Sequence, residues 1–254
     1  MGKTVFITGA TSGFGEAAAT VFAQNGYRLI LNGRRKERLQ RLQTLLQNNH
    51  NTAVVLLPFD VQDNKAVVAA VQSLPTHWQT VDILINNAGL ALGRDYFDDA
   101  SLDDWEQMID TNLKGLLYVT KAVLPLLRKS DAGHIINMGS IAGKEVYEKG
   151  NVYCATKHAV DAVSKAMRID LLRHGIKVTA IHPGAAETEF SVVRFKGDRQ
   201  AADAVYKSFR PLSAQDVASI IYYTATLPPH ICINDLVVTS TQQGSAVHFN
   251  KLGE

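Results

Sequence analysis

Short runs of apolar residues alternate with longer segments of mixed polarity from the first residues to about Thr239. The short runs are rich in Val, Ile and Leu, which is typical of strands that are buried on both faces of a sheet. The longer segments repeat their apolar positions with the period of an amphipathic helix. The predicted strands are Thr4–Thr8, Arg28–Asn32, Ala53–Phe59, Ile83–Asn86, His134–Met138, Lys177–Ile181 and Leu236–Thr239. The predicted helices are Gly15–Asn25, Lys36–Asn48, Asn64–Ser73, Ser101–Lys129, Val152–His174 and Ala214–Thr226.

This alternation predicts an α/β fold, a Rossmann-type doubly wound parallel sheet of about seven strands with helices on both faces. No Pro/Gly/Ser-rich linker and no repeat interrupts the alternation, so we expect residues 1–254 to form a single dinucleotide-binding catalytic domain. The helical period breaks only between Pro183 and Pro211. A long insertion after a strand of a regular scaffold is typical of a functional loop, so we expect residues 183–211 to form a substrate-binding lid.

Composition excludes several classes of protein. The chain has 254 residues, 46% of them hydrophobic, and Lys+Arg 26 nearly balance Asp+Glu 24. We therefore expect no nucleic-acid partner and no anionic membrane partner. Cys154 and Cys232 form neither a disulfide framework nor a zinc-ligand spacing, so we expect no metal. No apolar run reaches the roughly 18 residues that cross a bilayer, and no cleavable signal precedes the first strand, so we expect a cytoplasmic protein.

A glycine-rich turn links the first predicted strand to the first predicted helix. Unpaired N–H groups at a helix N-terminus attract phosphate, and glycines let a pyrophosphate approach the backbone closely. The spacing is Gly-x-x-x-Gly-x-Gly, which departs from the Gly-x-Gly-x-x-Gly of many dinucleotide folds. The turn predicts a dinucleotide site that contains Gly9, Thr11, Ser12, Gly13, Phe14 and Gly15.

The end of the second predicted strand indicates which dinucleotide binds. Sites that prefer NAD carry an acidic residue there, which binds the adenosine ribose, whereas arginine suits the 2′-phosphate of NADP. This chain has Asn32-Gly33-Arg34-Arg35 at that place, and after Glu16 its next acidic residue is Glu37. We therefore predict NADP as the cofactor, with its phosphate bound by Arg34 and Arg35.

Further motifs follow in a fixed order, and the whole set resembles the short-chain dehydrogenase/reductase family over nearly the entire chain. The set comprises the Thr8–Gly15 turn, Asp60, Asn86-Asn87-Ala88-Gly89, Asn112, Ser140 and Tyr153-x-x-x-Lys157. The resemblance implies that Asp60 and Val61 contact the adenine. It also implies ribose contacts from Asn87, Ala88 and Gly89, and nicotinamide contacts from Pro183, Gly184 and Thr188.

Tyr153 and Lys157 are four residues apart on a predicted helix, so their side chains share one face. A nearby ammonium favours a phenolate, and lowering a phenol pKa from about 10 to about 7 requires roughly 4 kcal/mol. Lys157 and an oxidised nicotinamide are the two candidates to provide it. Tyr153 would exchange a proton with a substrate oxygen, and Ser140, at a strand end, could polarise the same oxygen. The resemblance assigns Asn112 to a water-mediated proton relay with Lys157, and Lys157 also to the nicotinamide ribose.

The segment from Glu189 to Asp198 resembles bacterial NADP-dependent 3-hydroxy acid dehydrogenases, which act on serine and 3-hydroxypropionate-like acids. We therefore predict interconversion of a hydroxyl and a carbonyl on a small 3-hydroxy acid of the serine, 3-hydroxypropionate or 3-hydroxyisobutyrate type. Arg194 is our choice for binding the substrate carboxylate, with Arg94 and Lys196 as alternatives. Glu145 and Glu148 are expected near the pocket mouth, where they would repel an acidic substrate or bind the amino group of serine.

Two other functions remain open at this point. One is reduction of a short ketone, a diol or a 3-oxoacyl substrate, which needs the same catalytic residues. The other is a non-catalytic NADP-binding sensor, although intact Ser140, Tyr153 and Lys157 argue against it. The family resemblance also implies a homotetramer, built on the helices predicted at Ser101–Lys129 and Val152–His174. If the sheet buries only one side of the first of these helices, a monomer would leave four of its residues partly exposed: Leu113, Leu116, Leu117 and Thr120.

Overall fold

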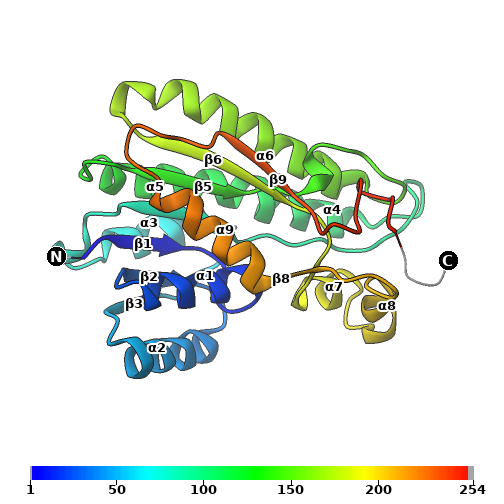
Figure 1. Ribbon diagram of the computed structural model, residues 1–254, viewed down its shortest axis with the longest axis horizontal. Coiled ribbons are helices and arrows are strands. Elements are labelled where there is room, and N and C mark those ends of the chain that lie inside the picture. Colours follow the sequence, from blue (N-terminus) through cyan, green and yellow to red (C-terminus); the bar gives the residue numbers. More distant parts are fainter. Residues whose placement is uncertain (1, 251–254) are drawn as a thin grey trace.

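Seven parallel strands form one sheet in a computed structural model, which describes residues 2–250 (Figure 1). Every neighbouring pair of strands is parallel. The predicted doubly wound fold is therefore confirmed, and most strand boundaries agree within two residues. In spatial order the strands are β3 (Val54–Leu57), β2 (Arg28–Asn32), β1 (Thr4–Ile7), β4 (Ile83–Asn86), β5 (His134–Met138), β6 (Lys177–Pro183) and β9 (Asp235–Val238).

Helices cover both faces of the sheet (Figure 1). Alternate strand residues explain this, because Ile7 packs in one hydrophobic cluster and its neighbour Phe6 in the other. No helix within residues 2–250 is both long and apolar enough to span a membrane. One face carries α1 (Gly13–Gln24), α2 (Lys36–His50) and α9 (Ala214–Thr226). The other carries α3 (Asn64–Gln72), α4 (Leu102–Ile109), α5 (Leu116–Leu127) and α6 (Asn151–Asp170).

The long helix predicted at Ser101–Lys129 is interrupted by a π-helix. The structure has α4, then π-helical residues Asp110–Gly115 (η2), then α5. Gly115 lets this wide turn approach the loop after β3, because a Cβ on Gly115 would lie 2.7 Å from Val61 Cγ2. Periodicity alone gives no sign of the extra residue in the turn.

Within residues 2–250 the structure also has three short 3₁₀ turns: η1 (Thr76–Trp78), η3 (Ile141–Gly143) and η4 (Leu172–His174).

The insertion between Pro183 and Pro211 contains more regular structure than its polar sequence predicts. Two short helices, α7 (Glu189–Arg194) and α8 (Arg199–Ala204), lie beside the end of the sheet (Figure 1). A two-stranded parallel sheet of β7 (Ala186–Glu187) and β8 (Leu212–Ser213) joins the two ends of the insertion. Its segments are therefore held close together at their base.

A capping box fixes the point at which the insertion ends and α9 begins. Ser213 Oγ accepts a hydrogen bond from the N–H of Asp216 (3.1 Å), and the Asp216 carboxylate accepts one from the N–H of Ser213 (2.8 Å). Each bond satisfies a backbone N–H that the helix itself leaves without a partner.

Replacing Ser213 by Ala removes this cap, so we expect the free energy of unfolding to fall by about 1 kcal/mol. Urea denaturation followed by circular dichroism measures the change. Ser219→Ala is the matched control, because Ser219 is exposed on the same helix and bonds only to Gln215 O one turn earlier. The control should change stability by less than about 0.5 kcal/mol. Equal losses in both variants would contradict the importance of the cap.

Candidate active site

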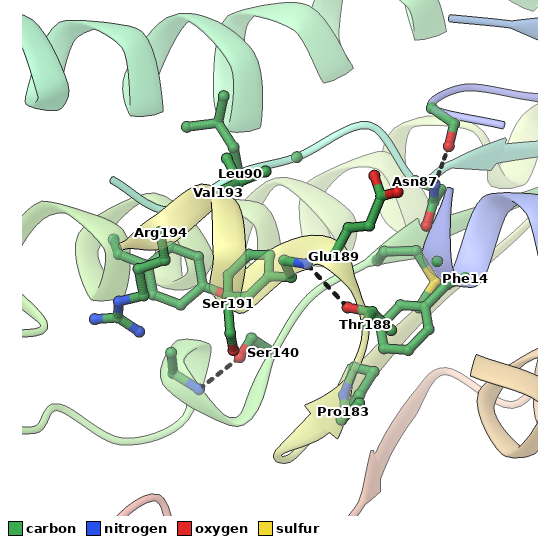
Figure 2. Close-up of a pocket in the computed structure, with 18 of the residues that line it drawn as sticks. Phe14, Asn87, Leu90, Ser140, Pro183, Thr188, Glu189, Ser191, Val193 and Arg194 are labelled. Carbon is green, nitrogen blue, oxygen red and sulfur yellow. Dashed lines mark hydrogen bonds between the residues drawn. The ribbon is translucent and has the colours of Figure 1, made fainter. Parts of the chain in front are cut away.

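A cleft of about 790 Å³ lies at the carboxyl ends of the strands, and Phe14, Asn87 and Ser140 are among its lining residues (Figure 2). The strand order shows that the chain leaves β1 and β4 in opposite directions there. In open α/β sheets this is the place where ligands bind. Two residues predicted for the site, Gly15 and Asn112, do not line the cleft. The predicted residues that do line it are Gly9, Thr11, Ser12, Gly13, Phe14, Arg34, Arg35, Asp60, Val61, Asn87, Ala88, Gly89, Ser140, Tyr153, Lys157, Pro183, Gly184, Thr188 and Arg194.

The glycine turn forms one wall of the cleft. Gly9 and Gly13 have φ angles of +65° and +55°, which only glycine adopts without strain. Gly15 lies behind the turn, where a Cβ would be 2.4 Å from Gly9 O and 2.5 Å from Asn87 Nδ2. Gly15 therefore permits close packing and does not contact a ligand in the cleft. The shape of the wall fits a pyrophosphate laid against bare backbone.

Arg34 and Arg35, which follow β2, both line the cleft. Arg35 Nη2 donates hydrogen bonds to Thr11 Oγ1 and Ser12 Oγ, both at 3.1 Å, so its guanidinium is held against the glycine turn. Arg34 Nη1 lies 3.4 Å from Asp60 Oδ2 and is largely exposed. Of the two, Arg35 is the more firmly oriented toward the cleft.

A third arginine and its partner, which the sequence pattern did not indicate, lie beside Arg35. Arg38 Nη1 donates to both carboxylate oxygens of Glu189, at 2.8 and 2.9 Å, and Arg35 Nη1 donates to Glu189 Oε2 at 3.2 Å. Burial raises the pKa of Glu189, but the bonds from Arg38 and Arg35 outweigh it, and the net pKa lies below its ordinary value. An anionic group thus already sits between two guanidiniums. Arg38 lies in the first turn of α2, three residues after Arg35, and this run of basic residues at the start of the helix was the available sequence signal.

Tyr153 and Ser140 lie together in the middle of the cleft. Ser140 follows the end of β5 after one residue, Gly139, and caps η3, where its Oγ accepts a hydrogen bond from the N–H of Ala142 at 3.1 Å. Tyr153 is buried, and this burial, with a smaller contribution from Tyr147, raises the pKa of its phenol, although a hydrogen bond with Ser140 acts in the opposite direction. In the protein alone, Tyr153 is therefore a neutral proton donor.

Lys157 lies behind Tyr153 on the same face of α6, as its spacing predicted. Its Nζ donates to Met138 O at 2.9 Å and is 6.0 Å from the centre of the Tyr153 ring. Burial lowers the pKa of Lys157 to about 8. Since burial of Tyr153 outweighs every charge near it, the ammonium by itself does not produce the phenolate that we expected it to favour. Bringing the phenol pKa down requires a further positive charge in the cleft.

Asn112 supports the wall of the cleft from behind. Its side chain exchanges two hydrogen bonds with the backbone of Leu90, both at 2.8 Å, and Nδ2 donates to Thr156 Oγ1 at 3.1 Å. The π-helical turn η2 carries it into this position, and such turns are frequent at functional sites. The structure thus places Asn112 as a link between the loop after β4 and the catalytic helix α6.

Arg194 extends from α7 into the cleft beside the catalytic residues (Figure 2). Its Nη1 donates to the Tyr147 hydroxyl at 3.0 Å, its Nε donates to Gly93 O at 3.3 Å, and its Cζ is 5.5 Å from the centre of the Tyr153 ring. Tyr147, which we did not predict, orients this guanidinium. Burial raises the pKa of Tyr147 and keeps its hydroxyl neutral.

The other charged candidates lie in different surroundings. Arg94 lines the cleft and is exposed, whereas Lys196 pairs with Asp104 at 2.8 Å and does not line it. Glu145 accepts a hydrogen bond from the N–H of Ala246, and Glu148 accepts one from the Tyr96 hydroxyl. Neither glutamate belongs to the lining itself, although Ala246, the partner of Glu145, does.

A family model of short chain dehydrogenases matches residues 3–198. The chain belongs to the short chain dehydrogenase family, in agreement with the order of motifs in its sequence and with the cleft at the carboxyl edge of its sheet.

Individual relatives are similar over almost the whole chain. The chain is 49% identical over 244 residues to sulfoacetaldehyde reductase 2 of Chromohalobacter salexigens, covering 96% of each protein. It is 46% identical over 248 residues to the NADP-dependent 3-hydroxy acid dehydrogenase YdfG of Escherichia coli (strain K12), covering 96% of this chain and 98% of that protein. Among solved structures, the closed form of a serine dehydrogenase complexed with NADP⁺ superposes with a TM-score of 0.90 at 46% identity, covering 96% of this chain and 97% of that one.

Replacing Arg34 and Arg35 together by Ala should raise the KM for NADPH at least about tenfold, because the 2′-phosphate loses charge-assisted hydrogen bonds. The KM for NADH, which lacks this phosphate, should change much less. Steady-state kinetics with both cofactors measures the difference, and Arg173→Ala, an exposed arginine in η4, is the control. An equal effect on NADPH and NADH would contradict the assignment of these arginines.

Proposed function

We propose that this protein is an NADP-dependent oxidoreductase that interconverts a hydroxyl and a carbonyl on a small substrate with a terminal anionic group. The observation that carries the proposal is Arg194, whose guanidinium lies 5.5 Å from the ring of Tyr153. A substrate that places its reacting oxygen at Tyr153 and Ser140 brings a group two or three atoms away within reach of this positive charge. A guanidinium there favours a carboxylate or a sulfonate.

The residues of the cleft fit an NADP molecule. The bare backbone at Gly9 and Gly13 suits the pyrophosphate, and Arg35, held against Ser12, suits the 2′-phosphate. At the other end, Pro183, Gly184 and Thr188 line the cleft beside Ser140, where the nicotinamide would be held. NADP, when bound, supplies or accepts the hydride of the reaction.

The protein's own residues handle the proton and the substrate oxygen. Tyr153 donates its proton to the oxygen during carbonyl reduction and accepts it during alcohol oxidation. Ser140 donates a hydrogen bond to the same oxygen and stabilises the charge that develops on it. Lys157, with a pKa lowered to about 8, holds the positive charge next to the phenol. A cationic nicotinamide adds the further charge that the buried phenol needs to ionise.

For the substrate we propose a small 3-hydroxy acid of the serine, 3-hydroxypropionate or 3-hydroxyisobutyrate type. In such an acid the carboxylate is separated from the reacting carbon by one carbon, which suits an anion site close to Tyr153. The similarity to the YdfG dehydrogenase and to the serine dehydrogenase structure supports this class.

A second candidate substrate is sulfoacetaldehyde, which is favoured by the 49% identity to a sulfoacetaldehyde reductase. Its sulfonate is also one carbon away from the carbonyl. Arg194 would bind it in the same way as a carboxylate, and Tyr147 could donate its hydroxyl proton to a third oxygen. The two substrates therefore compete for one site, and kcat/KM values measured side by side identify the preferred anion.

We also propose that residues 1–254 form one domain in which residues 183–211 act as a lid, because α7 contacts both ends of the cleft through Glu189 and Arg194.

We further propose a cytoplasmic homotetramer. Leu117 on α5 and Ile169 at the end of α6 are exposed apolar side chains, which supports contacts between copies on these helices, whereas Leu116 and Thr120 are buried within the chain. Light scattering on the purified protein gives the number of subunits.

Tyr153→Phe should lower kcat by at least about a hundredfold, because general acid-base catalysis commonly contributes 10²- to 10⁴-fold. The dissociation constant of NADPH, measured by calorimetry, should change little, since the phenol mainly serves the substrate oxygen. Tyr223→Phe, at an exposed position on α9, is the control and should retain normal turnover. Normal turnover in Tyr153→Phe would refute its role in proton transfer.

Arg194→Ala should raise the KM for L-serine, 3-hydroxypropionate or sulfoacetaldehyde by about tenfold or more, because each loses a charge-assisted bond. An uncharged secondary alcohol should be affected far less. Arg199→Ala, an exposed arginine of the same insertion, is the matched control. If the KM values of charged and uncharged substrates rise equally, the anion site is not at Arg194.

Tight NADP binding without turnover of any of these substrates or of a 3-oxoacyl substrate would indicate a sensor.

A further inference from the structure

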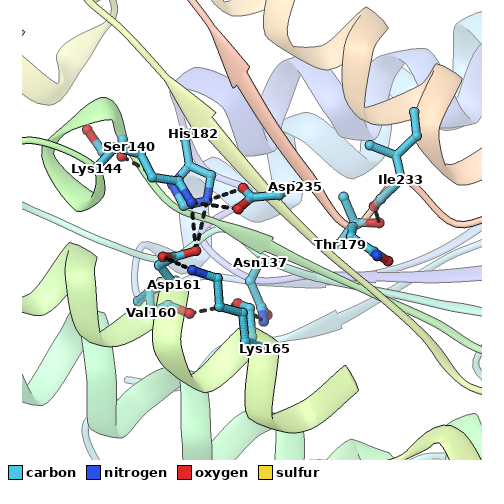
Figure 3. A network of polar contacts seen from close by, with 12 residues as sticks. Asn137, Ser140, Lys144, Val160, Asp161, Lys165, Thr179, His182, Ile233 and Asp235 are labelled. Carbon is cyan, nitrogen blue, oxygen red and sulfur yellow. Dashed lines mark hydrogen bonds and ion pairs between the residues drawn. The ribbon is translucent and has the colours of Figure 1, made fainter. Parts of the chain in front are cut away.

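His182 lies directly beneath the catalytic serine, although no step of the proposed reaction uses it. The residue is the last but one of β6, and its side chain is completely buried. Its ring packs flat against the residue before Ser140, since a Cβ on Gly139 would lie 2.4 Å from His182 Nδ1. On this side Nδ1 is 3.2 Å from Ser140 O (Figure 3). A carbonyl oxygen can only accept, so this contact is a hydrogen bond when the ring proton is on Nδ1.

The other ring nitrogen faces a cluster of four charged side chains (Figure 3). His182 Nε2 is 2.9 Å from Asp235 Oδ1 on β9 and 3.6 Å from Asp161 Oδ1 on α6. Lys144 Nζ, at the end of η3, bonds to both carboxylates at 2.6 and 2.8 Å. Lys165 on α6 bonds to the second oxygen of Asp161 at 2.8 Å. Two ammonium groups therefore balance two carboxylates before the imidazole is counted.

This charge balance explains the protonation state of His182. Burial lowers the pKa of His182, Lys144 lowers it further, and Asp235 and Asp161 raise it without reversing the net shift. Asp161, His182 and Asp235 bring possible metal-ligating atoms within 4.8 Å of one another, but the Lys144 ammonium already bonds to both carboxylates. At neutral pH the ring is therefore neutral. Nε2 lies close to Asp235 Oδ1 but makes no hydrogen bond to it, which assigns the single ring proton to Nδ1, opposite Ser140 O.

We propose that His182 is a positioning residue: its Nδ1–H holds the Ser140 carbonyl, and protonation of Nε2 loosens the Ser140 turn through the ion pair between Lys144 and Asp235. A protonated ring and Lys144 then compete for Asp235, because three cations face two carboxylates. Lys144 ends η3, and Ser140 caps the start of the same turn. Loss of the bond between Lys144 and Asp235 loosens the turn and moves the Ser140 hydroxyl away from its working position. This inference rests on the proposed function, since it assigns Ser140 to the reacting oxygen.

The test compares pH profiles of kcat, at saturating cofactor and substrate, for the wild type, His182→Asn and His182→Leu. Asn offers an N–H donor near the place of Nδ1 but does not titrate, and Leu offers no donor. At neutral pH, His182→Leu should lower kcat about tenfold with less than about a twofold change in the KM for NADPH. His182→Asn should restore kcat to within about threefold of the wild type.

The acid side of the kcat profile tests whether protonation of His182 loosens the Ser140 turn. Wild-type kcat should fall about tenfold as the pH drops through the pKa of His182, which lies below the ordinary value of about 6.5. This fall should be absent from His182→Asn. His77→Asn, an exposed histidine in η1, is the control and should keep the wild-type profile. If both His182 variants lose thermal stability while their folded fractions keep the wild-type kcat and profile, His182 is merely structural and the proposal fails.

A measurement that needs no turnover separates this proposal from the proposed function. In the cofactor-free protein, the ¹⁵N shifts of the His182 ring and the amide shifts of Ile141 and Ala142 should titrate together. The amide titration should disappear in His182→Asn. If no substrate is turned over but the coupled titration is present, the proposed function is wrong and the positioning role stands. If the amides do not follow the ring, the positioning role is overturned.

Discussion

The close approach of β1 and β4 at their carboxyl ends is the constraint on which the rest of the site depends. Thr8 Oγ1 accepts hydrogen bonds from the N–H groups of Asn87 and Ala88, both at 2.9 Å, and Asn87 Nδ2 donates to Thr8 O at 2.9 Å. Gly15 is required beside them because any Cβ would overlap Gly9 O. This junction fixes the glycine turn and the loop after β4 as one rigid surface, from which the cleft extends toward both ends.

Burial of ionisable groups governs the chemistry of this cleft. The same low-dielectric surroundings raise the pKa of the Tyr153 phenol and lower that of the Lys157 ammonium to about 8, so both groups are driven toward their neutral forms. A site built in this way responds strongly to any charge that enters with a ligand. The proposed proton transfer at Tyr153 would therefore depend on the charge that a bound cofactor brings.

Helix α7 connects the two ends of the cleft. Glu189 at its start bonds to Arg35 and Arg38 beside the adenosine end, and Arg194 at its end bonds to Tyr147 and Gly93 beside the catalytic residues. Glu189 and Arg194 are only five positions apart in the sequence. An anionic phosphate near Arg35 would compete with Glu189, so binding at that end of the cleft would act on the helix that carries Arg194.

The pattern of residues along the chain was sufficient to predict the parallel α/β fold, the glycine turn and the spacing of Tyr153 and Lys157, because these depend on local periodicity and on short-range geometry. It also predicted a phosphate contact for Arg34 and Arg35 and placed Arg194 on the insertion. The assembled fold brings distant groups together: Glu189 with Arg38, Tyr147 with Arg194, and His182 with Asp235 and Lys144. It also leaves Glu145 and Glu148 outside the lining of the cleft and forms the π-helical turn at Asn112. Such pairings join residues up to about 150 positions apart, and no periodic pattern records them because side-chain contacts arise only when the sheet and its loops are assembled.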